Sequence, residues 1–443
     1  MKRSRESGNE GAPLTDLEAV VTIESLAAGG AGVAHLADGM AVFVPRTAPG
    51  DRVALRDVRR HRRHAEAEVA DLVSPGPERV ESSCVHFERD HCGGCQWQHL
   101  SAAAQHAAKR RIVGDALRRI GRLDVPDPDL VVSPRPFGYR TTVTLTVLPA
   151  AAAAAAAAVG RIVGFHPEGE PGRVFPLERC EIAREELHAL WLALRPALES
   201  LPPGDDVRLK LRVAVEGALH VVVDGGEGAW HTPQPLARAV EAAGLTASLW
   251  WHPGGGAVRH MAGRGADPGA VSFEQVNAEV AALLRSAVLD AVPASAARVL
   301  DLYAGAGETA LAVAAAGRQV VMVEVDRAAV ARAERRARGA GLSVSCIAGR
   351  VEDHIAKLLP ADVVIANPPR TGLAEAVASR LAAHVSPLTS HSSRLVYVSC
   401  DPATLARDLR RLGATADHLK VLAFDMFPQT SHVETLAVLE GGG

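Results

Sequence analysis

The chain has 443 residues, of which 48% are hydrophobic and 22% are charged, and its net charge at pH 7 is only −3. Single cores stop growing at about 250–300 residues, so we expect two or three domains. The balanced charge excludes a globally basic nucleic-acid binder. No apolar run reaches the roughly 18 residues of a membrane span, and Met1–Gly11 is polar, unlike a signal peptide. We therefore expect a soluble, cytoplasmic monomer that does not contact a membrane.

The N-terminal part of the chain alternates short apolar segments with turns. Residues 1–15 are polar and are predicted to form a disordered tail. From Glu18 to Val73, short alternating segments are separated by turn pairs such as Gly29-Gly30 and Asp38-Gly39. This punctuation predicts a small OB-like β-barrel over residues 16–75.

Basic residues gather in two places despite the balanced total. They are Arg56, Arg59, Arg60, Arg62 and Arg63 in the first cluster, and Lys109, Arg110, Arg111, Arg118 and Arg119 in the second. Each cluster forms either a solvated face or a phosphate-binding surface. Because the first cluster lies at the far end of the predicted barrel, phosphate binding is the favoured interpretation there.

The middle of the chain mixes helical and strand patterns. Ser101–Gly121 has the spacing of a helix, Tyr139–Leu148 and Arg161–Phe165 are predicted to be paired strands, and Val207–Asp224 adds further strands. Ala150–Ala158 lies between the paired strands and is predicted to be a surface insertion. Residues 76–270 are therefore expected to form a central α+β domain.

The C-terminal part alternates strands and helices. Val299–Leu302, Gln319–Val323, Val363–Ala366 and Leu395–Ser399 are apolar strands, and Thr309–Ala316 is a helix. This order predicts a doubly wound, Rossmann-like α/β domain over residues 271–443. Its ligand is expected at the carboxyl ends of the strands.

A nucleotide-binding pattern begins in the first of these strands. Asp301–Gly307 reads "DLYAGAG", and the acidic residue Glu324 ends the next strand. Glycines let the backbone approach a ligand, and Glu324 is placed to accept both ribose hydroxyls. Because "DLYAGAGET" resembles motif I of class I methyltransferases, the favoured cofactor is S-adenosylmethionine, with an NAD-type dinucleotide as the alternative.

Two further residues stand where chemistry is expected. Cys400 follows a predicted strand end in "YVSCDPATLARDL", and Glu434 lies in "DMFPQTSHVETL". A lone cysteine is most often an inert core residue, which is the interpretation favoured for Cys346. The surrounding motifs favour a different role for Cys400.

These motifs, in this order, resemble the RNA 5-methyluridine methyltransferase family. They are "FEQVN", "DLYAGAG", "NPPRTG", "SCDPATLARD" and "DMFPQTSHVE". In the N-terminal part, "VTIESLAAGGAGVAHLADGMAVFVPRTAPGDRV" resembles a TRAM domain, an RNA-binding barrel, over about 60 residues. The resemblance covers nearly the whole chain. It implies that Cys400 is the nucleophile and Glu434 the general base. The cofactor-binding positions that we assign are Gln275, Tyr303, Gly305, Gly307, Glu308, Glu324 and Asn367.

The chemistry accounts for these residue types. Uridine C5 is a poor nucleophile, so a thiolate first adds to C6 and places electron density on C5, which then accepts the methyl group. A carboxylate afterwards removes the C5 proton, and the cysteine leaves. The thiol requires an electropositive or hydrogen-bonding setting, to which Arg370 is a candidate contributor. The target should be a uridine in a loop of rRNA or tRNA, flipped out of its stack.

The sequence departs from the family pattern at three positions. Glu308 and Asp401 stand where many members have Asn, and Asn367 stands where the family usually has Asp. "NPP" is also similar to the motif of amino-group methyltransferases acting on adenine or cytosine, but there an aromatic residue usually follows. Here Arg370 follows, which favours uridine. An RNA-binding or RNA-folding module with weak or lost catalysis is the other alternative.

Four cysteines form the remaining motif. Cys84, Cys92 and Cys95 are close in sequence, and Cys180 follows in "LERCEIA". Such a set can hold tetrahedral zinc or an iron-sulfur cluster. The family often carries a [4Fe-4S] cluster on three such cysteines and a distant fourth, so the cluster is favoured over zinc.

Overall fold

The computed structural model describes residues 19–149, 160–214, 216–254, 256–264, 275–385 and 393–441. The predicted tail and the Ala150–Ala158 tract lie outside these residues. The chain divides into two compact units. The first holds the residues up to Phe87 together with Cys95–Ala108 and Gln429–Ser431, and the second holds the rest.

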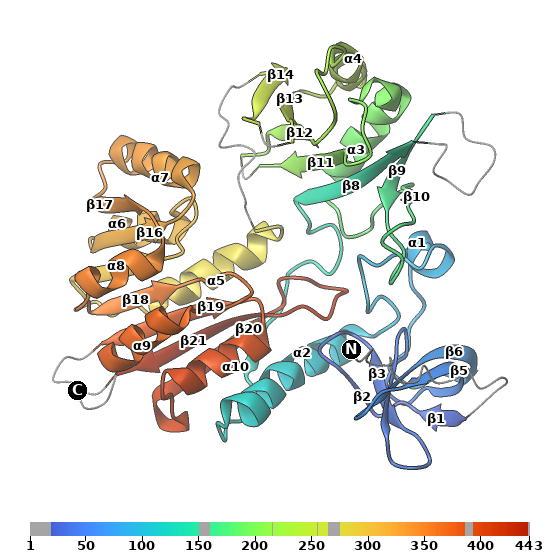
Figure 1. Ribbon diagram of the computed structural model, residues 1–443, viewed down its shortest axis with the longest axis horizontal. Helices are drawn as coiled ribbons and strands as arrows, with labels where there is room; N and C mark the ends of the chain where they lie inside the picture. The colour runs from blue at the N-terminus through green and yellow to red at the C-terminus, as the bar shows by residue number, and fades with distance from the viewer. Residues whose placement is uncertain are drawn as a thin grey trace, which may run out of the picture. The chain divides into compact units, whose positions relative to one another are not determined.

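The first unit is built on a six-stranded sheet (Figure 1). Its strands, in the order β1-β5-β6-β4-β3-β2, are β1 (Val20–Thr22), β2 (Ser25–Leu26), β3 (Gly32–His35), β4 (Ala41–Val44), β5 (Arg52–Arg60) and β6 (Ala65–Ser74). Alternate residues of β3, β4 and the first half of β5 are buried in one apolar cluster. This alternation is the pattern that predicted strands here, although β5 continues to Arg60, and β6 buries only its first alternating residues, Ala65 and Ala67.

The helix predicted over Ser101–Gly121 is confirmed. It consists of α2 (Ala102–Ala116) followed by a π-helical turn, Leu117–Gly121. A short helix, α1 (Val85–Arg89), precedes it in the chain.

A seven-stranded sheet forms the middle of the chain. In the order β10-β9-β8-β11-β12-β13-β14, its strands are β8 (Thr142–Pro149), β9 (Arg161–Phe165), β10 (Phe175–Pro176), β11 (Arg208–Val213), β12 (Leu219–Asp224), β13 (Ala247–His252) and β14 (Arg259–Ala262). The predicted antiparallel pair is confirmed as β8 and β9. Helices α3 (Glu185–Leu194) and α4 (Gln234–Ala242) bury Trp191 and Leu236 in the core of this α+β region.

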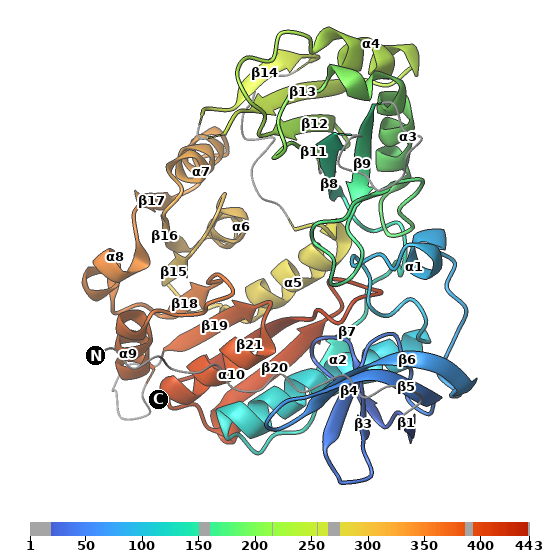
Figure 2. The same cartoon turned by 45° about the vertical axis from the view of Figure 1, so that its right-hand side comes forward.

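The C-terminal part forms an eight-stranded sheet in the order β17-β16-β15-β18-β19-β21-β20-β7 (Figure 2). The strands are β15 (Arg298–Leu302), β16 (Gln319–Glu324), β17 (Val344–Ala348), β18 (Val363–Ala366), β19 (Arg394–Ser399), β20 (Leu419–Phe424) and β21 (Glu434–Glu440). The first five strands in this order are parallel, and β21 is antiparallel to both its neighbours. The edge strand β7 (Asp129–Val131) comes from the segment that the sequence assigns to the central region.

Helices cover both faces of this sheet, as a doubly wound fold requires. One apolar core contains residues of α5 (Ala278–Asp290), α6 (Glu308–Ala315) and α7 (Arg327–Gly339). The other contains residues of α8 (Val351–Leu358), α9 (Glu375–His384) and α10 (Pro402–Arg411). The predicted α/β architecture is confirmed. Among the described residues, no helix is both long and apolar enough to cross a membrane.

Candidate active site

The carboxyl ends of the parallel strands bring several predicted site residues to one edge of the sheet. Tyr303 follows β15, Glu324 ends β16, Asn367 follows β18 and Cys400 follows β19. Neighbouring strands are in register up to these positions. In open α/β sheets this edge is where ligands bind.

The turn after β15 has the backbone that its glycines were expected to provide. Gly305 and Gly307 have φ angles of 55° and 76°, in the left-handed region that favours glycine. A Cβ on Gly307 would lie 2.9 Å from the Cβ of Ala333 in α7. Glu324 faces this turn, because its carboxylate accepts hydrogen bonds from the N–H of Gly305 at 2.8 Å and of Asp326 at 2.9 Å.

Asp301 is a candidate cofactor residue that the motif contained but that sequence reasoning did not single out. Its side chain is buried, and no described residue is a hydrogen-bond partner of its Oδ2 atom. Burial raises the pKa of Asp301 to about 7, against a hydrogen bond from the Ala310 N–H, and the nearby charge of Glu324 adds to the rise. An orphaned acceptor beside Glu324 and a glycine turn fit a ligand rich in N–H and O–H donors, as S-adenosylmethionine is.

Tyr303 and Asn367 differ in exposure. Tyr303 has a positive φ of 60° and packs against the core that contains residues of α8, α9 and α10. Burial raises its pKa to about 12. Asn367 is exposed, and its backbone N–H donates to the carbonyl of Leu302 at 3.2 Å. The Asn367 side chain therefore lies at the solvent side of the strand ends.

Glu308 and Gln275 lie at helix starts. Glu308 is the first residue of α6, and its carboxylate forms ion pairs with Arg336 and, at 3.9 Å, with Arg285. Gln275 is half-buried, two residues before the α5 N-cap Asn277. Phe273 and Glu274 of the "FEQVN" motif lie outside the described residues.

Cys400 and Glu434 are brought together by the pairing of β19 with β21. The last pair of this ladder is Ser399 with Thr435, so Cys400 follows one strand where Glu434 begins the other. The hydroxyl of Thr435 donates to the Ser399 carbonyl at 2.8 Å. Thirty-four residues of sequence separate the two side chains, and the register alone makes them neighbours.

The charges around this pair act in opposite directions. Glu434 is only 2% exposed, and burial raises its pKa to about 8, while the positive charge of Arg370 opposes the rise. Burial and then the charge of Glu434 raise the pKa of Cys400, which a hydrogen bond from Arg370 opposes. The hydrogen-bonding setting expected for Cys400 is therefore present, but its thiolate is not favoured overall because burial outweighs Arg370.

The chain after Cys400 turns at once into α10. The Asp401 carboxylate caps this helix by accepting the N–H of Thr404 at 2.8 Å, and Pro402 occupies its first turn. Asp is as good an N-cap as Asn, so the departure from the family pattern at Asp401 keeps the local geometry.

The segment leading to Glu434 is anchored by residues that the sequence interpretation missed or placed elsewhere. Lys109 was assigned to a basic cluster on a solvated or phosphate-binding face, and this is wrong. The Lys109 side chain is fully buried and donates to the carboxylate of Asp425 at 2.5 Å and to the carbonyl of Phe427 at 2.9 Å. Its spacing from Gln105 and Ile112, also buried on α2, was the available signal.

The six cysteines all lie among the described residues, and no disulfide bond joins any two of them. Cys84 and Cys95, in the first unit, are buried, whereas Cys92 and Cys180, in the second, are half-buried. The N–H of Gly94 donates to the Cys92 sulfur at 3.5 Å. Half-buried Cys346 lies on β17, as expected, and packs against the core.

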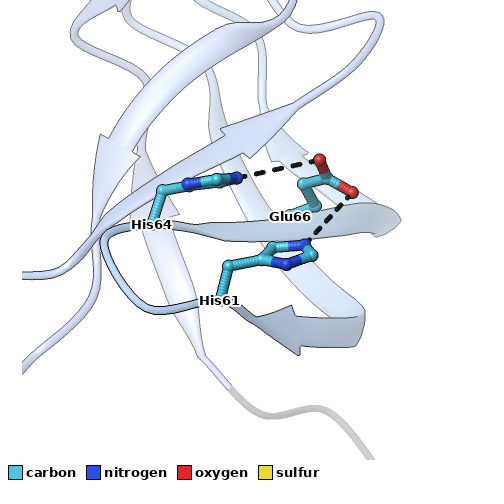
Figure 3. Close-up of side chains that lie close together, drawn as sticks. All are labelled: His61, His64 and Glu66. Carbon is cyan, nitrogen blue, oxygen red and sulfur yellow. Dashed lines mark ion pairs between the residues drawn. The ribbon is translucent and has the colours of Figure 1, made fainter.

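A different group, His61, His64 and Glu66, has ligand atoms within 4.8 Å of one another (Figure 3). It lies at the hairpin between β5 and β6, where the two imidazoles stack and face the carboxylate at 3.7 and 3.9 Å. Arg59 lies opposite Glu66 in the β5–β6 ladder, and Arg62 and Arg63 stand between the histidines in the chain. The positive charge of these arginines disfavours binding of a metal ion, so an imidazole-carboxylate contact is the simpler interpretation.

Comparison with known proteins agrees with this geometry. A family model described as tRNA (uracil-5-)-methyltransferase matches residues 349–441, and one described as methyltransferase domain matches residues 299–387. The crystal structure of the tRNA (uracil-54, C5)-methyltransferase of Pyrococcus abyssi with S-adenosyl-L-homocysteine is similar at a TM-score of 0.72, with 22% identity, over 95% of this chain and 100% of that one.

Two curated relatives are similar over nearly their whole length. An uncharacterized RNA methyltransferase of Thermosynechococcus vestitus is 34% identical over 94% of this chain and 96% of its own. The 23S rRNA (uracil(1939)-C(5))-methyltransferase RlmD of Aromatoleum aromaticum is 32% identical over 95% and 99%. The fold and these matches define an S-adenosylmethionine-dependent RNA methyltransferase. The chain belongs to the RNA 5-methyluridine methyltransferase family, the RNA (uracil-5-)-methyltransferases.

Proposed function

We propose that this enzyme methylates C5 of a uridine through a covalent bond between Cys400 and C6 of the base, with Glu434 as the general base. The observation that carries the proposal is the β19–β21 register, which sets a half-buried thiol beside a buried carboxyl at the ligand-binding edge of the sheet. Neither residue is needed for RNA binding alone.

The reaction divides between the two side chains. The Cys400 thiolate adds to C6, and the resulting enolate carries its electron pair at C5. S-adenosylmethionine, when bound, supplies the methyl group that C5 accepts. Glu434 then takes the proton from C5, the C5–C6 double bond reforms, and the Cys400–C6 bond breaks to return the thiolate. A carboxylate with a raised pKa is a stronger base than an ordinary one, which suits removal of a carbon-bound proton.

Arg370 supports both residues. Its guanidinium hydrogen-bonds Cys400, and its charge lowers the pKa of both Cys400 and Glu434 against the effect of burial. We propose that this contact maintains a usable fraction of thiolate.

The cofactor is proposed to bind along the same edge. Glu324 would accept the ribose hydroxyls, and the turn containing Gly305 and Gly307 would admit the ligand close to the backbone. The orphaned Asp301 Oδ2 supports a donor-rich ligand there. The other proposed contacts are Gln275, Tyr303, Glu308 and Asn367.

We further propose 23S rRNA as the substrate, since the relative from Aromatoleum aromaticum that is named a 23S rRNA methyltransferase is 32% identical over 95% of this chain and 99% of its own. The sheet of the first unit is proposed to be the TRAM-type barrel that contacts RNA. Arg59, Arg62 and Arg63, exposed at its β5–β6 hairpin, would contact phosphates.

The four cysteines Cys84, Cys92, Cys95 and Cys180 are proposed to hold a [4Fe-4S] cluster. Four cysteines outside disulfide bonds, one of which accepts a backbone N–H bond as cluster sulfurs do, fit thiolate ligation. Iron and sulfide analysis of anaerobically purified protein tests this, and about one zinc per chain without iron would contradict it.

Tritium release from RNA labelled at uridine C5 tests the function. Wild-type enzyme with S-adenosylmethionine should release tritium from 23S rRNA but not from a tRNA transcript. Cys400→Ser should abolish release, by on the order of 1000-fold or more, while cofactor binding persists. Cys346→Ser, at the other half-buried C-terminal cysteine, is the matched control and should retain activity.

Three outcomes would contradict parts of the proposal. Full activity of Cys400→Ser would exclude Cys400 as the nucleophile. Tritium release from the tRNA transcript and not from 23S rRNA would show that tRNA is the substrate. If mass spectrometry finds the methyl group on adenine or cytosine, the enzyme is an amino methyltransferase.

A further inference from the structure

The loop Arg370–Leu373, between β18 and α9, is held by three side chains of α10. The Thr404 hydroxyl donates to the Arg370 carbonyl at 3.0 Å, and Arg407 donates to the Thr371 carbonyl at 2.7 Å. The Leu373 N–H donates to the Asp408 carboxylate at 2.8 Å. Three contacts from little more than one helical turn fix the backbone of this loop.

Asp408 joins more structure than the other two. Its side chain is 0% exposed. The Oδ2 atom accepts the Leu373 N–H and also the hydroxyl of Tyr397 on β19, at 2.9 Å, while Oδ1 accepts from Arg407 at 2.9 Å. The carboxylate therefore ties the loop, the strand before Cys400 and the helix after it to one point.

This arrangement matters because of what stands at each end of it. Cys400 and α10 are joined by only Asp401, so the helix carries the thiol. Arg370 is exposed and does not belong to either apolar core of this sheet, so the position of its side chain depends on the loop backbone that carries it. Because the loop is hydrogen-bonded to α10, the position of Arg370 is fixed relative to Cys400.

We infer that Asp408 is a positioning residue for the reaction: it fastens the Arg370 loop to α10 so that the guanidinium reaches the Cys400 sulfur. The inference rests on the proposed role of Cys400. Asp408 contacts neither substrate nor cofactor and acts through Arg370.

The reactivity of Cys400 measures this directly and needs no RNA. The full-length enzyme is alkylated with iodoacetamide across pH 7–10, and modification of the Cys400 peptide is followed by mass spectrometry. Asp408→Asn should slow alkylation at pH 8 by about three- to tenfold, because a rise of one pKa unit removes about nine-tenths of the thiolate. Arg370→Met should do the same.

Two further variants guard against a merely structural effect. Thr404→Val removes the hydrogen bond to the Arg370 carbonyl without burying a new polar group, and should slow alkylation about two- to threefold. This variant keeps the inference testable even if Asp408→Asn folds poorly. Ser379→Ala, which removes an exposed helix hydroxyl bonded to the Glu375 carbonyl, is the matched control and should change nothing.

The double variant Arg370→Met/Asp408→Asn decides the route of the effect. If Asp408 acts through Arg370, the double variant should alkylate at the rate of Arg370→Met alone. Additive slowing would overturn the inference, as would unchanged alkylation in folded Asp408→Asn and in Thr404→Val. Normal alkylation of Arg370→Met would overturn it together with the proposed role of Arg370. Methyl transfer by Cys400→Ser, by contrast, bears on the proposed function and leaves this measurement intact.

Discussion

Lys109 of α2 and Asp425, the residue after β20, form an ion pair that is closed to solvent, with side-chain exposures of 0% and 4%. The pair holds the start of the connection that leads to Glu434. Further bonds follow along the same connection, from Asn277 to the Met426 carbonyl and from Tyr139 to the Pro428 carbonyl. The segment that leads to Glu434 is therefore held by side chains that donate hydrogen bonds to three successive backbone carbonyls.

Lys109→Met should destabilise the protein strongly. Removal of one partner leaves the Asp425 charge buried and uncompensated, at a cost of about 3–5 kcal/mol. Urea unfolding measures the change. Lys420→Met is the control, because the Lys420 side chain is 81% exposed in its pair with Glu440 and should contribute less than about 1 kcal/mol. Equal effects of the two variants would contradict a buried anchor.

Glu434→Gln should stabilise the enzyme near neutral pH. The folded-state pKa of Glu434, about 8, lies above the ordinary 4.5, so the folded protein keeps a proton that the unfolded chain releases. The contribution of this carboxyl is thus favourable below pH 4.5 and is lost as the pH rises to 8, by on the order of 4 kcal/mol. The amide carries no such penalty. Thermal unfolding should show the variant more stable at pH 8 and equal to wild type near pH 4.5.

Glu324→Gln and Glu308→Gln should distinguish the contributions of two acidic residues near the glycine turn to cofactor affinity. Glu324 already faces the N–H of Gly305, so its loss should weaken binding of S-adenosylmethionine by about tenfold or more. Glu308 is also a proposed contact, but its carboxylate is held by Arg336, so its contribution should be the smaller one and its loss should change affinity less than about threefold. Titration calorimetry measures both. A large effect of Glu308→Gln would show that this carboxylate leaves Arg336 for the cofactor.

The sequence predicts the parallel strands β15, β16, β18 and β19 of the C-terminal sheet, because apolar strands such as Val363–Ala366 are buried on both faces and carry an unbroken pattern. It also places Cys400 at a strand end. It does not predict β7, since three residues at an edge, Asp129–Val131, leave little apolar signal. Nor does a local pattern indicate that β21 returns antiparallel beside β19, which is what pairs Cys400 with Glu434.

Buried polar residues were the main failure of sequence reasoning. Lys109 and Asp408 are charged residues on helices, and such residues are almost always exposed unless paired. Their partners, Asp425 and Tyr397, are distant in sequence or on another element. Only the folded structure shows that the charge of each side chain has a partner. Lys109 supports the segment before Glu434, and Asp408 lies on the helix after Cys400.

Methyl transfer should increase from pH 6 to pH 9. Burial raises the pKa of both Cys400 and Glu434, so the thiolate and the carboxylate that the proposed reaction uses become more populated over this range. Arg370→Met should move the profile further toward alkaline pH, because Arg370 lowers both values. Glu434→Gln should instead form the Cys400–RNA bond but fail to release it, so that a protein–RNA band that resists denaturation accumulates on gels. Rapid turnover of Glu434→Gln without such a band would assign proton removal to another group, and a flat profile would place both groups outside the rate-determining steps.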